Sequence, residues 1–248
     1  MSDTSPPSIS GYVNFRDLGG HPTPDGPVRR GRVYRSDSLA HVNATDVEHL
    51  IDERGVRTVV DLRGATEVDA YPNHPMREAG ATIHHVPLID PAKREESGFE
   101  WETMTLVDLY RFILESAGPQ FVEVMQIIAE PANHPLVFHC AAGKDRTGIT
   151  AGLVLHVLGV DDDVIAADYA LSGEAMQRLI VWAREQQGVF MQPRSPIPSA
   201  ASEARPETMI AFLEAVRART GGGDGLLASL GLDSGAADRV RDLLLEPA

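Results

Sequence analysis

The chain has 248 residues, of which 43% are apolar, and its formal net charge is −14. This length and composition suit one large domain, or one domain plus a substantial insertion, with a sizeable hydrophobic core. The acidic excess excludes general nucleic-acid binding and disfavours adsorption to an anionic membrane, because both partners carry negative charge. The only cysteine, Cys140, excludes an intramolecular disulfide.

The first ten residues and the hydropathy of the chain bear on localisation. Residues 1–10 are rich in Ser and Pro, so we expect this segment to be flexible. They lack the charged and apolar regions of a signal peptide, and no stretch approaches the roughly 20 apolar residues of a membrane span. We therefore expect a cytoplasmic protein without membrane insertion. Secretion without a conventional signal peptide stays open as the alternative.

Strand-like and helix-like segments alternate along the first two thirds of the chain. The predicted strands are 32–35, 58–62, 81–86 and 135–139, and the predicted helices are 45–55, which begins with the capping box Thr45–Glu48, then 105–116, 119–130 and 146–158. This alternation predicts an α/β fold of three layers, in which helices flank a mostly parallel central sheet. Ligands bind such sheets beyond the carboxyl ends of the strands.

The remainder of the chain reads as helical. Asp161–Asp163 predicts a helix N-terminus rather than a cation site, since acidic side chains cap and complement that end of a helix. An apolar stripe from Met176 to Ala183 predicts another helix, and Pro206 begins a further one. Glycines at 221–225 predict a hinge before a small helical unit at 226–245.

The most informative segment is His139–Gly148, which lies between a predicted strand and a predicted helix. A tight loop there would turn the backbone N–H groups of residues 141–146 toward one point at a helix N-terminus, where anions bind. Cys140 would lie at the floor of this site, and Arg146 would bind two oxygens of the anion. These surroundings favour the thiolate, which can attack phosphorus and form a covalent intermediate.

Neighbouring residue types fit the same site. We expect Gly143 where no side chain fits and Gly148 where the first helical turn packs closely against the loop. The Thr147 hydroxyl would donate to the sulfur, and His139 would fix the loop through backbone carbonyls. Lys144, one of only two lysines, suits a second phosphate or a carboxylate of the substrate, with a solvated surface lysine as the alternative. The predicted anion-binding set is Ala141, Ala142, Gly143, Lys144, Thr147 and Gly148.

The segment His139–Gly148 matches the signature His-Cys-x5-Arg-Thr-Gly of the cysteine-dependent protein tyrosine phosphatase superfamily. Its Gly-Lys-Asp-Arg interior resembles the bacterial tyrosine and phosphoinositide phosphatases of that superfamily. Three further segments are similar to that group, Asn14–Gly20, Arg35–Leu39, and Asp61–Arg63 with Glu67, so the resemblance covers roughly residues 10–245.

The resemblance implies a tyrosine-phosphatase-like fold within one phosphatase domain over residues 1–248. It also implies a helical lid over the active site, for which residues 174–205 are the candidate. The alternative is an ordinary helix that caps the core, followed by a disordered loop at 191–205. We expect neither a metal nor another cofactor, because the nine histidines are scattered and only His84 and His85 are adjacent.

Hydrolysis also needs a proton donor for the leaving oxygen. The Trp-Pro-Asp loop of many tyrosine phosphatases is missing, since neither tryptophan of this chain precedes Pro-Asp. Asp145 is the first candidate, because the resembled group favours the aspartate inside the loop, and Asp61 and Asp90 follow. In the alternative readings, Asp145 only braces the loop and Asp61 pairs with Arg63.

We predict a phosphatase that hydrolyses phosphotyrosine and, given Lys144, phosphoinositide monoesters through a cysteinyl phosphate at Cys140. Its partner would be a phosphoprotein or phosphoinositide substrate. One alternative is a phosphoresidue-binding module with weak or no turnover. Another is a rhodanese-like sulfur transferase, whose chemistry does not require Arg146 and Thr147.

Overall fold

The computed structural model describes residues 12–70, 72, 74–89, 104–185, 203–232 and 234–247. The described part contains a five-stranded sheet in the order β1-β2-β5-β3-β4. The strands are β1 (Arg16–Asp17), β2 (Val33–Ser36), β3 (Thr58–Asp61), β4 (Thr82–His85) and β5 (Leu136–His139). Only β1 pairs antiparallel to its neighbour, so the predicted mostly parallel sheet is confirmed.

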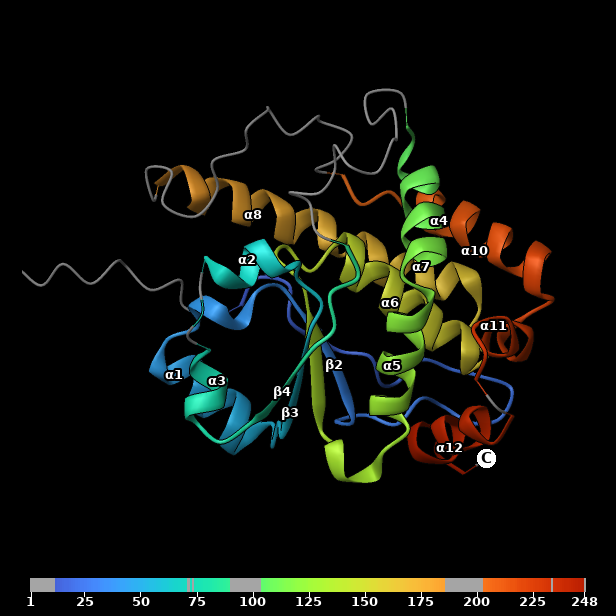
Figure 1. The fold of residues 1–248 in the computed structure, drawn as a ribbon, viewed down its shortest axis with the longest axis horizontal. Coiled ribbons are helices and arrows are strands. Elements are labelled where there is room, and N and C mark those ends of the chain that lie inside the picture. Colours follow the sequence, from blue (N-terminus) through green and yellow to red (C-terminus); the bar gives the residue numbers. More distant parts are fainter. Residues whose placement is uncertain are drawn as a thin grey trace, which may run out of the picture.

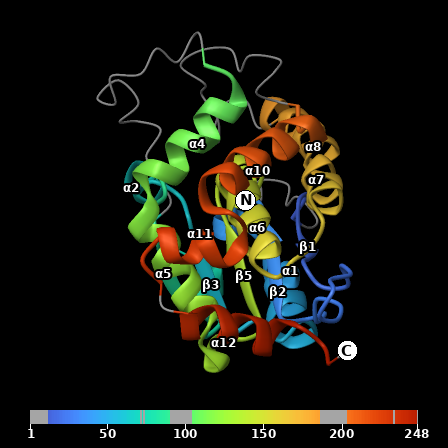
Figure 2. The same cartoon turned by 90° about the vertical axis from the view of Figure 1, so that its right-hand side faces the viewer.

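Helices cover both faces of the sheet, which gives the predicted three layers (Figure 1). One face carries η1 (Leu39–His41), α1 (Ala44–Glu48), η2 (His49–Glu53) and α3 (Pro75–Glu78). The other face carries α4 (Leu106–Ser116), α5 (Gly118–Ile128), α6 (Asp145–Val157), α7 (Asp162–Ala170), α10 (Pro206–Thr220), α11 (Gly223–Ser229) and α12 (Ser234–Leu244) (Figure 2). The short turn η4 (Pro131–Asn133) leads into β5.

Two further helices lie beyond one end of the sheet, α2 (Ala65–Asp69) and α8 (Ser172–Glu185) (Figure 1). α2 follows β3 directly along the chain, so this is the end at which the parallel strands finish. The candidate lid 174–205 includes most of α8, but residues 186–202 lie outside the described residues. The lid therefore stays a prediction, and the expected flexible segment 1–10 also lies outside the described part.

The three central strands, β2, β5 and β3, bury both of their faces, because helices pack on each side. Along β5, Leu136 and Phe138 join the large core beneath α4–α7 and α10–α12, whereas Val137 joins a smaller core beneath η1, η2 and α3. In β3, Val60 joins the large core and Val59 joins the smaller one. This alternation of period two explains why the strands read as continuous apolar runs in the sequence.

The first helix begins earlier than the sequence predicted. Asn43, not Thr45, is the N-cap: its side chain accepts from the Asp46 N–H at 2.9 Å, and Asp46 accepts from the Asn43 N–H at 3.1 Å. Asn caps a helix at least as well as Thr, and the reciprocal pair satisfies two backbone donors at once. Thr45 consequently lies inside the first turn, and the predicted Thr45–Glu48 capping box is wrong.

The C-terminal elements follow the sequence more closely. Pro206 begins α10 as predicted, and Asp161 is the N-cap of α7, although its side chain makes no capping bond. Gly221 ends α10 with a φ of 78°, but Gly223 already begins α11, so the predicted glycine hinge is a helix cap and a helix start. The predicted unit 226–245 consists of most of α11 together with α12.

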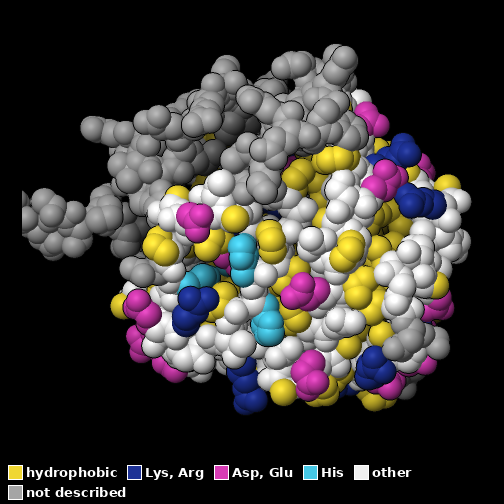
Figure 3. Space-filling view, viewed as in Figure 1, with side chains coloured by type: hydrophobic (Ala, Val, Ile, Leu, Met, Phe, Trp, Pro, Cys, Tyr) yellow, Lys and Arg dark blue, Asp and Glu magenta, His cyan; other side chains and the backbone are white. Residues whose placement is uncertain are grey.

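None of the helices in the described part is long and apolar enough to cross a lipid bilayer. On the face shown in Figure 3, charged side chains of both signs are dispersed among apolar ones, and the described atoms form no continuous basic surface there.

Candidate active site

The parallel register brings the ends of three strands together. Ser36 of β2 and Asp61 of β3 lie directly opposite His139, the last residue of β5. Cys140 follows His139, so the predicted catalytic loop starts at the carboxyl end of the central strand. In parallel sheets this is where ligand sites form.

The loop is held by its carbonyl groups. The carbonyl of Cys140 is bonded by His139 Nδ1 at 3.0 Å, and that of Ala141 accepts from the Ser38 N–H at 3.0 Å. The next two carbonyls accept from side chains: Ala142 from Asn14 Nδ2 at 3.0 Å and Gly143 from Arg35 Nη2 at 2.9 Å. His139 therefore fixes the loop through a backbone carbonyl, as the sequence predicted.

These four bonds determine where the amides point. In a planar trans peptide the N–H points opposite to the preceding C=O, so carbonyls bonded outward leave the following N–H groups directed inward. Within the described part of the chain, the N–H groups of Ala141, Ala142 and Gly143 have no hydrogen-bond acceptor. The loop thus presents unpaired donors beside Cys140 and next to the N-terminus of α6, which is an arrangement that binds an anion.

Gly143 is required by a close backbone approach. Its φ is 69°, and a Cβ placed there would lie 2.6 Å from the Ser36 carbonyl oxygen, 2.7 Å from the Asp37 nitrogen and 2.8 Å from Asn14 Nδ2. Any side chain would push the loop away from β2. The expectation that no side chain fits at Gly143 is confirmed.

A buried ionic network supports the same loop from below. Arg35 is almost fully buried; it donates to the Gly143 carbonyl and, through Nη1, to Asp168 at 2.7 Å. Asp168 also binds Arg16 Nε at 2.7 Å. Burial, together with the neighbouring Arg16, lowers the pKa of Arg35 to about 10, which Asp168 opposes. Asp168 thereby supplies a shared counter-charge to the buried Arg35 and the partly exposed Arg16.

Arg146 is oriented by Glu67, a residue of α2. Nη1 of Arg146 lies 2.5 Å from Glu67 Oε2 and Nη2 lies 2.8 Å from Oε1, and Nη1 also donates to the Ile89 carbonyl at 3.3 Å. Burial disfavours the charged guanidinium, but the bonds to Glu67 and the charge of Cys140 raise the pKa of Arg146 above its usual value. The site therefore holds a permanent positive charge in a fixed position.

The other residues of the signature are placed as follows. Cys140 is 2% exposed, and Thr147 is fully buried with a hydroxyl that has no hydrogen-bond partner among the described residues. A Cβ on Gly148 would lie 3.0 Å from the ring of Tyr169, so this glycine makes room for α7 rather than for the loop. An unpaired buried hydroxyl beside the loop calls for an acceptor that the described residues do not supply.

Lys144 and Asp145 form a pair at the start of α6. The Lys144 side chain is fully buried; its Nζ donates to the Glu203 carbonyl at 3.2 Å and lies 3.3 Å from Asp145 Oδ1. The alternative of a solvated surface lysine is therefore wrong. Asp145 is 36% exposed, and its Oδ1 also accepts from the Tyr110 hydroxyl at 2.6 Å.

The carboxylate of Asp61 is bound by Arg63. The backbone N–H and guanidinium of Arg63 bind both carboxylate oxygens at 2.6–3.1 Å. Burial alone would raise the pKa of Asp61, but the facing His139 and the bonds from Arg63 hold it well below its usual value. The carboxylate is thus ionised, in keeping with the reading that Asp61 pairs with Arg63. Asp90, the third candidate acid, lies outside the described residues.

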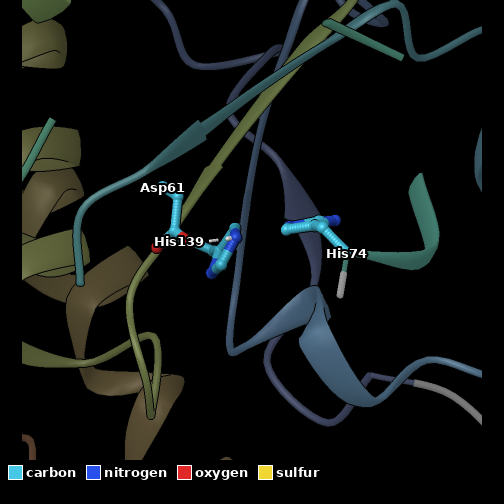
Figure 4. A group of neighbouring side chains, drawn as sticks. All are labelled: Asp61, His74 and His139. Atoms are coloured by element: carbon cyan, nitrogen blue, oxygen red, sulfur yellow. Dashed lines mark ion pairs between the residues drawn. The ribbon is translucent and has the colours of Figure 1, made fainter. Parts of the chain in front are cut away.

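Three potential metal ligands meet beneath the loop. One donor atom each from Asp61, His74 and His139 lies within 4.8 Å of the others, and all three side chains are buried (Figure 4). Burial lowers the pKa of His74 to about 3, so its ring is neutral. However, Arg63 binds both oxygens of Asp61, and its positive charge would repel a cation there. The donor set therefore does not fit a metal ion.

The sequence pointed to only part of this site. Asn14, Arg35 and Glu67 lie in segments that resembled the phosphatase group, but no pattern in these segments predicted their contacts. Asp168 and Tyr110 carry no local signal at all, because they come from α7 and α4 and meet the loop only through tertiary packing.

Known proteins with similar sequences indicate which family this chain belongs to. Residues 7–246 match the sequence profile described as "Tyrosine phosphatase family". The triple specificity protein phosphatase PtpB of Mycobacterium tuberculosis is 26% identical, over 96% of this chain and 98% of PtpB. A tyrosine-protein phosphatase of Nostoc commune is 30% identical, over 83% of this chain and 74% of that protein.

Among solved structures, the core catalytic domain of the PP-IP phosphatase SIW14 from S. cerevisiae, in complex with citrate, is 15% identical, with a TM-score of 0.40 over 71% of this chain and 93% of that one. The family match extends over nearly the whole chain and includes the His139–Gly148 loop. The chain belongs to the tyrosine phosphatase family, and the predicted phosphatase activity is confirmed at the level of that family.

Proposed function

We propose that this chain hydrolyses phosphate monoesters, with phosphotyrosine as its leading substrate, through a phosphocysteine at Cys140. The observation that carries the proposal is the outward bonding of four successive loop carbonyls, Cys140 to Gly143, which directs the following amides toward the cysteine. Preorganised donors of this kind stabilise the oxygens of a transferring phosphoryl group.

Arg146 supplies the remaining donors. A guanidinium has five N–H bonds; Glu67 and the Ile89 carbonyl take both from Nη1 and one from Nη2. The two that remain, on Nε and Nη2, lie along the same edge of the group. That edge can bind two phosphoryl oxygens in parallel, which is the bidentate geometry that favours arginine at phosphate sites.

The reaction takes two steps. The Cys140 thiolate attacks phosphorus, a P–S bond forms, and the P–O bond to the leaving group breaks with its electron pair on that oxygen, which takes a proton from Asp145. Water then attacks phosphorus and gives a proton to the Asp145 carboxylate, while the P–S electron pair returns to sulfur. The Thr147 hydroxyl, which has no hydrogen-bond partner among the described residues, would donate to this departing thiolate.

Asp145 is preferred over Asp61 as the acid. Asp145 lies inside the loop and is partly exposed, so it can reach a leaving group, whereas Arg63 binds both oxygens of Asp61. An ionised carboxylate paired in this way has no proton to give. Asp61 is instead proposed to hold Arg63 and His139 beneath the loop.

The substrate class rests on the relatives. One is named a tyrosine-protein phosphatase and another a triple specificity protein phosphatase, which supports phosphotyrosine first and a second class of phosphoester after it. Phosphoinositides are the second class we propose. For Lys144 to bind a second phosphate, its ammonium would have to leave Glu203 and Asp145.

The test measures phosphate release from an aryl phosphate, a phosphotyrosyl peptide and a phosphoinositide, each in the presence of a chelator. We expect turnover of the first two with wild type and none with Cys140→Ser. Capture of the phosphopeptide without phosphate release would favour the binding-module alternative. Retained turnover in Cys140→Ser would remove Cys140 from the nucleophile role.

A further inference from the structure

Two buried tyrosines lie in line with the proposed acid. Tyr110 of α4 donates to Asp145 Oδ1 at 2.6 Å, and the hydroxyl groups of Tyr110 and Tyr169 are 2.6 Å apart. Tyr110 is 0% exposed and Tyr169, from α7, is 1% exposed. The mechanism above gives neither tyrosine a part.

The direction of this chain of hydrogen bonds follows from the number of protons. A phenol has one O–H, and that of Tyr110 is given to the carboxylate of Asp145. Tyr169 must therefore donate to the oxygen of Tyr110. Burial, reinforced by the charge of Asp145, raises the pKa of both phenols far above neutral pH, so both stay protonated.

The two oxygens of Asp145 then differ. Oδ1 accepts from Tyr110 and also faces the Lys144 ammonium, 3.3 Å away. Oδ2 has no hydrogen-bond partner among the residues that the structure describes. A proton on Oδ1 would compete with two donors, whereas a proton on Oδ2 meets none.

Packing holds the tyrosines in place. The Tyr110 ring lies edge-on to Tyr169 and to Phe212, with ring centroids 6.2 and 5.9 Å apart. Tyr169 is in turn close to Gly148, where a Cβ would be 3.0 Å from its ring. Three helices and a glycine of the signature thus fix the hydroxyl that binds Asp145.

We propose that Tyr110, oriented by Tyr169, is a positioning residue for the acid: it anchors Asp145 Oδ1 so that the transferable proton lies on Oδ2. This rests on the proposed role of Asp145. The alternative is that the two buried phenols only satisfy the hydrogen-bonding groups of each other and of the nearest carboxylate, with no effect on proton transfer.

The test compares kcat/KM of wild type and Tyr110→Phe for aryl phosphates whose leaving phenols become steadily more basic. A strongly basic leaving group needs the proton and a weakly basic one does not, so we expect a loss of about 10-fold for the former and little for the latter. A hydrogen bond donated to a carboxylate favours its ionised form, so removal of the Tyr110 hydroxyl should move the basic limb of the pH–rate profile to higher pH. Tyr169→Phe should give a smaller change of the same kind.

Tyr34→Phe is the matched control, because it removes a hydroxyl from another buried tyrosine, on β2 and in the smaller core. It should leave both the leaving-group dependence and the basic limb unchanged. A uniform loss across all leaving groups in Tyr110→Phe, with an unmoved basic limb, would overturn the positioning role.

Asp145→Asn separates this inference from the proposed function. If Asp145→Asn steepens the leaving-group dependence and Tyr110→Phe does not, only the positioning role is overturned. If Asp145→Asn itself leaves the dependence unchanged, the proposed acid is wrong and the role of Tyr110 is overturned with it.

Discussion

Glu67 binds Arg146 end-on, with Nη1 and Nη2 at 2.5 and 2.8 Å from its two carboxylate oxygens. The pair joins α2 to the first turn of α6 and, within the described part of the chain, leaves Nε and one N–H of Nη2 without an acceptor. Glu67 is 22% exposed and Arg146 10%, so the pair is largely shielded from solvent. Its main effect is to fix a charge that otherwise would have several orientations.

Glu67→Gln should therefore lower activity by misplacing Arg146. We expect kcat/KM for an aryl phosphate to fall by about 10- to 100-fold, since a small displacement of a positioning group has effects of this size. Steady-state kinetics measure it, with Glu78→Gln on α3 as the control for loss of one acidic charge. Equal kcat/KM in wild type and Glu67→Gln would show that Arg146 does not depend on Glu67.

Gly143→Ala should destabilise the protein more than a comparable glycine replacement. Gly143 and Gly80 both have positive φ, 69° and 95°, but a Cβ on Gly80 meets nothing within 4 Å whereas one on Gly143 meets backbone at 2.6 Å. Gly80→Ala should cost roughly 1 kcal/mol from the backbone alone, and Gly143→Ala about 2 kcal/mol more, with loss of activity.

Denaturant unfolding and an activity assay on both variants separate the cost of a positive φ, which both share, from the cost of the steric contact at residue 143. If the loop packs closely against β2, the Gly143 variant must be the less stable of the two. Equal unfolding free energies would contradict it.

Asp168→Asn should be strongly destabilising, because it leaves Arg16 and Arg35 without their shared counter-charge. Breaking a buried ion pair from one side costs about 3–5 kcal/mol, whereas the more exposed pair of Asp162 with Arg217 should contribute about 1 kcal/mol or less. Thermal or denaturant unfolding of Asp168→Asn and Asp162→Asn tests the contrast. Similar losses in the two variants would rule out a central structural role for Asp168.

Stability should fall on acidification in part because of His74. Burial lowers the pKa of His74 from 6.5 to about 3, so the unfolded chain binds a proton that the folded chain does not between these values. The contribution of His74 is complete above pH 6.5 and is lost as the pH falls toward 3. His74→Gln should remove about 3 kcal/mol of the decrease between pH 6.5 and 4.

The measurement is the free energy of unfolding from denaturant titrations across that pH range. The slope against pH should be shallower in His74→Gln than in wild type. Equal slopes in the two proteins would mean that protonation of the buried His74 ring does not destabilise the folded state.

The sequence was a good guide wherever structure is local. The run Leu136–His139 gave the central strand, and the pattern at 146–158 gave α6 to within a residue at each end. The catalytic loop could be predicted as well, because Gly143, Arg146 and Thr147 serve one site within ten residues. The first helix was misplaced only because Asn43 competes better for the cap than Thr45.

The sequence was a poor guide to contacts between distant elements. The partner of Arg146 is 79 residues away, and Tyr110 lies 35 residues before the aspartate that it binds. Nothing in the neighbourhood of Asp168 shows that it pairs with two arginines from the start of the chain. Lys144 was expected to face a substrate, yet packing of the loop against Glu203 buries its side chain.

The most direct test of the account is to trap the covalent intermediate. Wild type mixed with an aryl phosphate and quenched in acid should carry one phosphoryl group per chain, located on Cys140 by mass spectrometry of the digested protein. Cys140→Ala should carry none and release no phosphate. A phosphoryl group on another residue, or phosphate release by Cys140→Ala, would contradict the claim that this cysteine is the nucleophile.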